Sequence, residues 1–335
     1  MEIPNPMNTY KILVVGCGSI GQRHTRLLSA RKDVELYIAD TLEENRKYCL
    51  ENFRVKKAFE DYSQALIEGM DGVFICVPTG LHVPIAKQAL DSGACVLIEK
   101  PVGLSVADVE VLKGIPHADE RIQVGYMNRY NTQLQRIKQM IDSGALGNIL
   151  YANASVYTYG TLLFAKTSFR EHEEWALIRD YTHEIDFLLY LLGPVEEVVA
   201  MSATLGELDH LPSPNIVEII SRFNSGAIGS IHMDYARYPD KRTMEIVGDI
   251  GSIEFYINEG ILRIYHKDKK GFREEREPFL RDDMFRDQIE TIIGMIKKEV
   301  KPMVSLSEGI EALKFCEAAI TSSVEKRFVS LKQDE

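Results

Sequence analysis

The feature that most constrains the fold is an alternation of short apolar runs and helical patterns over the first 125 residues. Residues 11–15, 72–77 and 95–98 are continuous apolar runs, typical of strands buried on both faces of a parallel sheet. Further strands are predicted at 34–39, 55–58 and 122–126, and helices at 22–31, 43–51, 62–68, 83–92 and 105–113. This alternation predicts right-handed crossovers and a doubly wound sheet.

The pattern changes after residue 145. A long strand is predicted at 149–159, followed by strands at 196–205, 216–223, 227–235, 242–248, 252–257 and 261–266. Turn signals such as Asn224-Ser225-Gly226 separate them and indicate a mostly antiparallel sheet, flanked by helices at 181–192, 284–300 and 308–325. We predict an α/β chain of two domains. A Rossmann domain spans 1–125, and an α+β domain with a large open sheet spans 126–335, whose last helix is a candidate to pack back on the first domain.

Composition excludes several function classes. The 335 residues carry 39 basic and 50 acidic side chains, a net charge of −11, which disfavours nucleic acid and anionic lipid as partners. No apolar run is long enough to cross a bilayer, and residues 1–9 do not resemble a signal peptide. The five cysteines lack C-x-x-C spacing, so we expect neither disulfides nor a metal site, but buried thiols in the cytoplasm.

A glycine-rich turn follows the first predicted strand. The segment Gly16-Cys17-Gly18-Ser19-Ile20-Gly21 has the pattern G-x-G-x-x-G between a strand and a helix. The first glycine permits the tight turn, the second lets a pyrophosphate approach the backbone, and the third lets helix and strand pack closely. The helix N-terminus offers free N–H groups to the anion. Gly16, Gly18, Ser19, Ile20 and Gly21 are therefore predicted to bind a dinucleotide.

Asp40 ends the second predicted strand, 19 residues after Gly21. A carboxylate at this position accepts a hydrogen bond from the adenosine ribose and repels a 2′-phosphate, which favours NAD over NADP. In the alternative interpretation, Asp40 caps the helix that begins near Leu42. Either Arg46 or Arg23 could still neutralise a phosphate, so NADP stays open as the less favoured cofactor.

Two further loops follow buried strands, where ligands of open α/β sheets bind. They are Val77-Pro78-Thr79-Gly80-Leu81-His82 and Glu99-Lys100-Pro101. The proline biases Lys100 away from helical geometry, and partial burial would lower the pKa of its amine toward the range useful for proton transfer. The alternative for any single lysine is a solvated surface charge. We predict Lys100 as catalytic, and as cofactor contacts Val77, Pro78, Thr79, His82, Glu99 and Lys100.

These three loops resemble the glucose–fructose oxidoreductase, inositol dehydrogenase and rhizopine-catabolism (Gfo/Idh/MocA) family of NAD(P)-dependent oxidoreductases. The resemblance extends over nearly the whole chain through residues 125–130, 242–253 and 304–313. It implies a Rossmann domain, then a large open sheet whose outer face makes a homodimer or homotetramer. It also implies hydride transfer between a sugar carbon and nicotinamide, with Lys100 near cofactor and substrate.

The family places an Asp and a His four residues apart in the second domain, whereas Asp180 and His183 here are three apart. Residues i and i+3 of a helix share a face, so the resemblance still implies that both contact substrate and act in catalysis. In the alternatives, Asp180 caps the helix, and His183 is a core histidine partnered by Asp186. Lys100 and His183 are the two groups able to take the hydroxyl proton near neutral pH.

Further substrate contacts are predicted at the domain junction and in the second domain: Asn128, Arg129, Tyr157, Arg170 and Arg179. Arginines in such a position suit an acidic or nucleotide-linked sugar, and the alternative is ordinary ion pairing. The segment around Trp175 is either a lid or a helix. Competing functions are a non-catalytic nucleotide-sensing regulator and a redox-neutral enzyme that retains its NAD. An enone or biliverdin reductase is disfavoured because Lys100 and His183 occur together.

Overall fold

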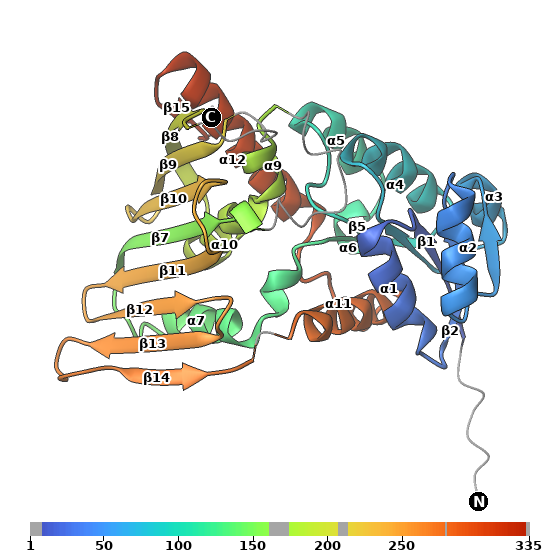
Figure 1. Cartoon of the computed structure of the whole chain (residues 1–335), viewed down its shortest axis with the longest axis horizontal. Coiled ribbons are helices and arrows are strands. Elements are labelled where there is room, and N and C mark those ends of the chain that lie inside the picture. Colours follow the sequence, from blue (N-terminus) through green and yellow to red (C-terminus); the bar gives the residue numbers. More distant parts are fainter. Residues whose placement is uncertain (1–8, 161–173, 207–213, 279, 333–335) are drawn as a thin grey trace, which may run out of the picture. The chain divides into compact units, whose positions relative to one another are not determined.

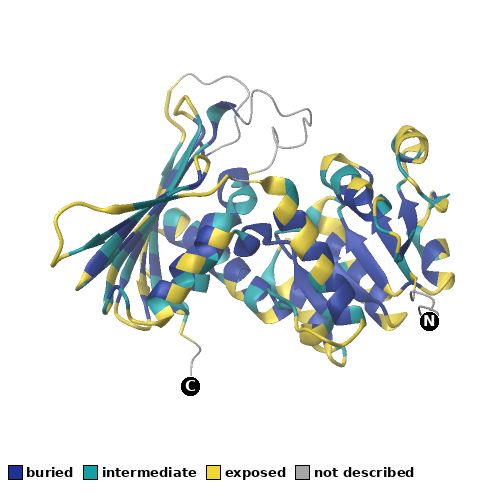
Figure 2. Cartoon of the chain, turned by 90° about the horizontal axis from the view of Figure 1, so that it is seen from below, coloured by how far each residue is buried: buried dark blue, intermediate teal, exposed yellow. Residues whose placement is uncertain are grey.

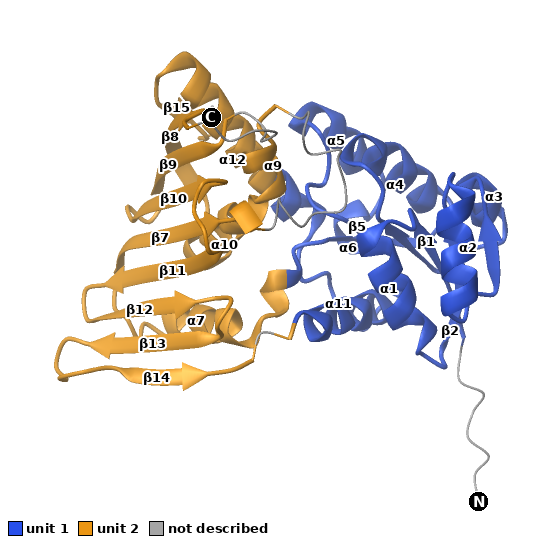
Figure 3. Cartoon of the chain, viewed as in Figure 1, with its two compact units in different colours: residues 1–127, 281–310 blue, residues 128–280, 311–335 orange. Residues whose placement is uncertain are grey.

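The structure is a computed structural model that describes residues 9–160, 174–206, 214–278 and 280–332 (Figure 1). It divides into two compact units (Figure 3). Unit 1 comprises Met1–Met127 and Arg281–Ile310, and unit 2 comprises Asn128–Leu280 and Glu311–Glu335. Arg170 lies outside the described residues.

Unit 1 is built on a six-stranded parallel sheet in the order β3-β2-β1-β4-β5-β6. Its strands are β1 (Tyr10–Val15), β2 (Val34–Ala39), β3 (Lys57–Phe59), β4 (Gly72–Ile75), β5 (Cys95–Ile98) and β6 (Ile122–Val124). The strand order reverses between β1 and β4, which is the switch point at which doubly wound sheets bind ligands. The predicted Rossmann architecture is confirmed.

Helices connect and cover these strands. They are α1 (Ser19–Ser29), α2 (Glu43–Asn52), α3 (Tyr62–Ile67), α4 (His82–Asp91), α5 (Val106–Lys113), α6 (Ala118–Arg121) and α11 (Arg281–Ile296), with a 3-10 turn η1 (Thr79–Leu81). All residues of β4 and β5 are buried. Figure 2 shows strands of the parallel sheet of unit 1 in dark blue, the colour of buried residues. This burial explains why the apolar runs predicted these two strands within two residues of their ends.

Helix α11 belongs to unit 1 although it comes late in the sequence. A Cβ atom on Gly72 of β4 would lie 3.1 Å from Ile296 and 3.5 Å from Ile292, so the missing side chain lets α11 approach the sheet. The sequence predicted a continuous second domain from residue 126 to 335. The structure differs because residues 281–310 complete unit 1, and helix α12 (Leu306–Glu325) begins in unit 1 and continues in unit 2.

Unit 2 is built on a nine-stranded sheet in the order β14-β13-β12-β11-β7-β10-β9-β8-β15. Its strands are β7 (Ile149–Tyr157), β8 (Val195–Ala203), β9 (Ile216–Phe223), β10 (Ile228–Asp234), β11 (Lys241–Gly248), β12 (Gly251–Tyr256), β13 (Ile261–His266), β14 (Arg273–Arg276) and β15 (Val329–Ser330). Only the β7–β10 pair is parallel among the pairs of this described sheet, so the prediction of a mostly antiparallel sheet is confirmed.

One face of this sheet is covered by helices of the same unit: α7 (Thr132–Asp142), α9 (Ala176–Asp180), α10 (Thr182–Leu192) and the later part of α12 (Figure 1). We call this covered side of the sheet the helix face. Arg242 of β11 lies on it, because it forms an ion pair with Glu184 of α10. Residues of the opposite face include Tyr157, His232 and Ile220, and no described helix of the unit covers it. We call it the open face.

The sequence analysis did not predict α7, β14 or β15. Helix α7 carries a detectable signal, because Asn131 accepts a hydrogen bond from the Leu134 N–H at 2.9 Å and Leu134, Ile137 and Met140 form its buried stripe. Within the described part of the chain, no helix combines the length and apolarity that crossing a bilayer requires.

Candidate functional site

The glycine loop joins β1 to α1 in unit 1. Gly16 has φ +89°, and a Cβ atom there would lie 2.5 Å from the Cys76 carbonyl oxygen. A Cβ atom on Gly21 would lie 1.8 Å from the Gly16 carbonyl oxygen, so the start of α1 contacts the turn directly. A Cβ atom on Gly18 would meet no protein atom within 4 Å. The loop therefore has the space and the exposed backbone N–H groups that a pyrophosphate requires, with Ser19 and Ile20 beginning α1.

Asp40 fixes this loop to the end of β2. Its Oδ2 atom accepts hydrogen bonds from the Cys17 N–H at 2.6 Å and from the Asn45 amide at 3.2 Å. Its Oδ1 atom accepts one from the Leu42 N–H at 2.8 Å. Leu42 itself is the N-cap of α2, which has no side-chain cap, so the alternative in which Asp40 caps this helix is wrong. A carboxylate has about four lone-pair sites. Asp40 therefore retains acceptor capacity for a ribose hydroxyl.

The two arginines considered for a 2′-phosphate differ in their surroundings. Arg46 donates to the carbonyl oxygens of Asp40 at 2.6 Å and Thr41 at 3.1 Å. The guanidinium of Arg23 lies over the Phe285 ring, with its Nε 3.8 Å from Asp282. The guanidinium of Arg46 therefore lies beside Asp40 at the end of β2, whereas that of Arg23 is held by Phe285 and Asp282.

His82 joins the two loops that follow β4 and β5. It is 1% exposed, and its Nδ1 and Nε2 atoms each lie 2.9 Å from a backbone carbonyl oxygen, of Pro101 and of Val77 respectively. Burial lowers the pKa of this imidazole, and the two carbonyl contacts offset only part of that effect. Because both nitrogens are engaged by the protein, the structure assigns His82 to joining the loops rather than to contacting a cofactor. The loop after β4 also contains three residues that remain predicted cofactor contacts: Val77, Pro78 and Thr79.

Glu99 and Lys100 follow β5. The Glu99 carboxylate lies 3.3 Å from the imidazole of His24 and accepts a hydrogen bond from the Lys100 N–H at 3.4 Å. Lys100 is half-buried, and the Lys100–Pro101 peptide bond is cis. The structure thus brings the glycine loop, Asp40, Glu99 and Lys100 to the carboxyl ends of the strands in one unit. His24 is the residue of this group that the sequence analysis did not identify.

The second group of predicted residues lies in unit 2, where α9 meets α10. Asp180 is the last residue of α9, Tyr181 is the N-cap of α10, and His183 lies in the first turn of α10. The structure therefore does not support the alternative in which Asp180 caps the helix. Tyr181 ties this junction to the sheet, because its hydroxyl hydrogen-bonds that of Thr158, next to the end of β7. The segment after Trp175 is a helix, one of the two predicted alternatives.

Asp186, which the core-histidine alternative makes the partner of His183, has a cationic partner in Arg129. It holds Arg129 in a buried, bidentate ion pair, with Arg129 Nη2 2.7 Å and Nε 3.0 Å from Asp186 Oδ1. The two side chains are 3% and 0% exposed. The predicted substrate residue Arg129 is therefore a buried structural cation, because its charge is already neutralised. His183 stacks on Phe187, with ring centroids 6.4 Å apart.

Three other predicted substrate residues differ in their surroundings. Asn128 is 2% exposed, and neither atom of its amide has a hydrogen-bond partner among the described residues. Arg179, one residue before Asp180, forms no ion pair with any described residue. The ring of Tyr157 contacts that of His232 in a tilted arrangement, with centroids 4.9 Å apart, and lies under Arg237, on the open face. The structure therefore does not bring Tyr157 together with Asp180 and Tyr181, which lie on the helix face.

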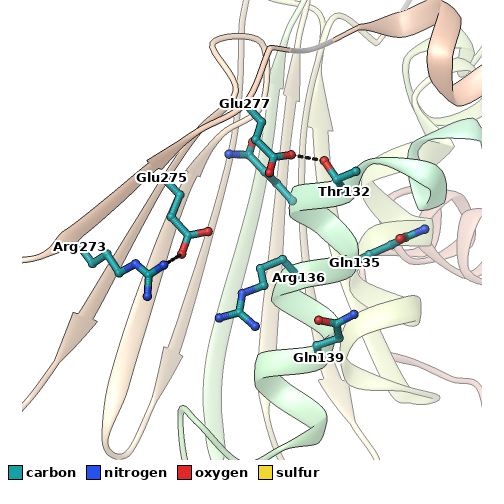
Figure 4. Close-up of a pocket in the computed structure, with 8 residues that line it drawn as sticks. Thr132, Gln135, Arg136, Gln139, Arg273, Glu275 and Glu277 are labelled. Carbon is teal, nitrogen blue, oxygen red and sulfur yellow. Dashed lines mark hydrogen bonds and ion pairs between the residues drawn. The ribbon is translucent and has the colours of Figure 1, made fainter.

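A separate polar groove of about 410 Å³ lies between α7 and β14 of unit 2 (Figure 4). Its walls carry an ion pair between Arg273 and Glu275 and a hydrogen bond from Thr132 to Glu277. None of the predicted site residues lines it; its lining residues are Thr132, Gln133, Gln135, Arg136, Gln139, Arg273, Glu275 and Glu277. The groove is therefore distinct from both groups described above.

Comparison with known proteins agrees with this geometry. Residues 10–126 match the model of the oxidoreductase family with an NAD-binding Rossmann fold, and residues 134–254 match the GFO/IDH/MocA C-terminal domain. The chain is 28% identical to myo-inositol 2-dehydrogenase of Thermotoga maritima over 337 residues, which cover 96% of this chain and 99% of that protein.

Solved structures share the fold. A myo-inositol dehydrogenase from Corynebacterium glutamicum superposes with a TM-score of 0.82 at 19% identity, covering 97% of this chain and 100% of the other. The WlbA dehydrogenase from Bordetella pertussis, in complex with NADH and UDP-GlcNAcA, superposes with a TM-score of 0.79 at 24% identity, again covering 97% and 100%.

The fold of unit 1 and its glycine loop define an NAD-binding oxidoreductase with a Rossmann domain. More specifically, the chain belongs to the Gfo/Idh/MocA family, whose two domain models together match most of its length. The predicted family resemblance and the predicted cofactor, NAD, are both confirmed.

Proposed function

We propose that this protein is an NAD-dependent dehydrogenase that oxidises a CH–OH group of a sugar or cyclitol. The observation that carries the proposal is the half-buried Lys100, which lies with Glu99 at the carboxyl end of β5 in the NAD-binding unit. An amine at this edge of the sheet is near the position where doubly wound folds bind their ligands. The similarity to myo-inositol 2-dehydrogenase supports a polyhydroxylated ring as the substrate.

In the proposed mechanism, bound NAD supplies the acceptor for the hydride that leaves the substrate carbon. The hydroxyl on that carbon must lose its proton as the hydride departs, because a carbon that carries a neutral hydroxyl is a poor hydride donor. Lys100 and His183 are the groups that we assign to this proton, and such assistance accelerates reactions by roughly 10²–10⁴-fold. Asp180 accepts hydrogen bonds from ring hydroxyls, and Arg179 supplies a positive charge for an acidic or nucleotide-linked sugar.

The test is NAD reduction by the purified protein under anaerobic conditions. The substrates are myo-inositol and free sugars, uronic acids and UDP-linked sugars, each followed by absorbance of NADH. We expect reduction with at least one class. Lys100→Met and His183→Gln should each lower kcat by roughly 10²–10⁴-fold, while NAD binding persists. The matched control is Lys87→Met, since Lys87 is exposed on α4 and pairs with Asp91.

Three results would contradict this proposal or a part of it. Complete silence with tightly retained NAD would indicate a redox-neutral enzyme that cycles its cofactor. Silence with freely exchanging NAD would indicate a nucleotide-sensing regulator. Wild-type turnover in Lys100→Met would remove Lys100 from the mechanism.

We also propose that NAD is preferred over NADP because of the Asp40 carboxylate. Asp40→Asn keeps an acceptor for the Cys17 N–H but removes the charge. A hydrogen bond to a charged group contributes about 1.5–3 kcal/mol, so we expect NAD affinity to fall by at least tenfold while affinity for NADP stays level or rises. Fluorescence titration with both reduced cofactors measures this ratio. An unchanged ratio would show that Asp40 does not select the cofactor.

We further propose that the protein is a homodimer or homotetramer assembled through the open face, and that it functions in the cytoplasm. The five free cysteines support a reducing compartment. The open face supports self-association because it exposes Met201 at 77% and Ile220 at 51% on the adjacent strands β8 and β9.

A further inference from the structure

His24 is a buried histidine whose only described hydrogen-bond partner is a residue of the proposed active site. It lies on α1, is 0% exposed, and its ring centroid lies 5.1 Å from those of Phe74 and Phe285. Its Nε2 atom lies 3.3 Å from Oε1 of Glu99. Its Nδ1 atom is buried without a partner among the described residues. Because Nδ1 faces no acceptor, Nε2 carries the hydrogen that is donated to the carboxylate.

Glu99 is held from the other side as well. Its Oε2 atom accepts the hydrogen bond from the Lys100 N–H at 3.4 Å. The same oxygen lies 2.9 Å from the point where a side chain on Gly125 would begin, so the absence of a Cβ there leaves room for the carboxylate. The carboxylate is 15% exposed. One oxygen of Glu99 is therefore fixed by α1, and the other is directed at the backbone of Lys100.

We propose that His24 is a positioning residue that acts through Glu99 to hold Lys100 in place for catalysis, an inference that rests on the proposed function of Lys100. A purely structural core position does not require this arrangement. Burying an imidazole with an unpaired nitrogen between two phenyl rings is unfavourable, and an apolar side chain would fill that space at lower cost. The imidazole of His24 is stabilised by one described hydrogen bond, and its acceptor is Glu99, the residue that precedes Lys100.

The experiment compares His24→Leu with His24→Gln. Leucine fills the apolar space without a donor, whereas the glutamine amide can place an N–H near the position of Nε2. We expect His24→Leu to lower kcat by roughly tenfold to 10²-fold, because misplaced catalytic groups cost up to about that much. The KM for NAD should stay within about twofold, and His24→Gln should recover most of kcat. A structural role would lower the melting temperature in both variants without this split.

A second readout does not depend on turnover. Reductive ¹³C-methylation gives each lysine an NMR resonance, and Lys100→Arg assigns that of Lys100. We expect the Lys100 resonance and its pH titration to shift in His24→Leu and to return toward wild type in His24→Gln, while that of Lys87 stays constant. If His24→Leu fails to fold, Glu99→Gln should produce the same shift, since it weakens both hydrogen bonds of the carboxylate.

An unchanged Lys100 resonance in folded His24→Leu, or in Glu99→Gln, would overturn the inference whatever the turnover. Absence of turnover in the wild-type protein, together with a shifted Lys100 resonance, would overturn the proposed function and leave the positioning of Lys100 by His24 intact. Equal loss of kcat in His24→Leu and His24→Gln, with no shift of the resonance, would show that His24 serves packing alone.

Discussion

At the scale of single residues, the glycine loop separates glycines required for folding from a glycine required for binding. Gly21→Ala places a Cβ atom 1.8 Å from the backbone oxygen of Gly16, and neither backbone can yield easily. Gly18→Ala meets no protein atom within 4 Å, and Gly18 has φ −72°, which any residue adopts. The two substitutions are chemically identical, so they form a matched pair.

We expect Gly21→Ala to destabilise the protein by about 1–3 kcal/mol or more, since overpacking has costs of that order. We expect Gly18→Ala to keep the wild-type melting temperature but to weaken NAD binding by about tenfold or more, because its methyl group occupies the pyrophosphate position. Thermal unfolding with and without NAD measures both effects. Wild-type NAD affinity in Gly18→Ala would show that the pyrophosphate lies elsewhere.

His232 on the open face predicts a dependence of stability on pH. Its ring is held between Asp234 at 2.7 Å and Glu218 at 2.6 Å. Burial lowers the pKa of His232, but the hydrogen bonds to Asp234 and Glu218 outweigh it, so the pKa lies above its ordinary value. A raised histidine pKa stabilises the folded state fully below the unfolded value of about 6.5. That stabilisation is lost as pH rises through the folded-state pKa.

The measurement is the melting temperature of wild type and His232→Gln from pH 5.5 to 9. We expect wild type to lose stability relative to the variant as pH rises above about 6.5. Parallel curves would show that His232 does not titrate in this range. Other groups cancel in the comparison because only one residue differs.

The positions of some site residues could be predicted from the sequence, whereas the contacts of others could not. The glycine loop and the Glu99-Lys100-Pro101 loop were predictable because strand ends fix where such loops lie. In β7, the alternation of small apolar and polar residues already indicates that Tyr157 faces away from Ala154 and Val156, which lie on the helix face. By contrast, the ion pair of Asp186 with Arg129 depends on packing between residues 57 apart in the sequence, and no local pattern encodes it.

At the scale of elements, one buried glutamine attaches the late segment of the chain to the sheet of unit 1. The side-chain oxygen of Gln123 in β6 accepts hydrogen bonds from the N–H groups of Met303 at 2.7 Å and Val304 at 3.3 Å. Gln123 is 0% exposed. Its removal would leave two backbone donors in a buried position without an acceptor.

We expect Gln123→Leu to lower the free energy of unfolding of unit 1 by about 1–3 kcal/mol per lost acceptor bond. Gln64→Leu is the matched control, because Gln64 is an exposed glutamine of the same unit. Urea unfolding followed by circular dichroism compares the two. Equal stability of both variants would mean that water replaces the Gln123 carbonyl.

The boundaries of a helix or strand could be predicted best where its own sequence has a clear apolar pattern. Strands β2, β5, β9 and β13 have the predicted boundaries because they are bounded by clear turn residues. The helix at 281–296 was predicted within a few residues of its ends, but its place in unit 1 was not. The packing of Ile292 and Ile296 against Gly72 is a contact across more than half of the sequence, and no local pattern encodes it.

At the scale of the whole molecule, the open face predicts the state of assembly. Ile220→Asp introduces a charge at a position that self-association would bury, so we expect the wild-type oligomer to dissociate toward monomers. Ile67→Asp is the matched control, because Ile67 is 86% exposed on α3 of unit 1. Light scattering after size-exclusion chromatography gives the mass. A monomeric wild type, or an unchanged mass in Ile220→Asp, would contradict assembly through this face.

The chain passes between its two units at residues 127/128, 280/281 and 310/311. A gene fragment that stops at residue 127 would therefore encode the whole parallel sheet but expose Gly72 and leave Gln123 without Met303. We expect such a fragment to aggregate. Chimeras that exchange cofactor modules among relatives must transfer residues 281–310 together with the first 127, so a single recombination point does not suffice to build a working hybrid.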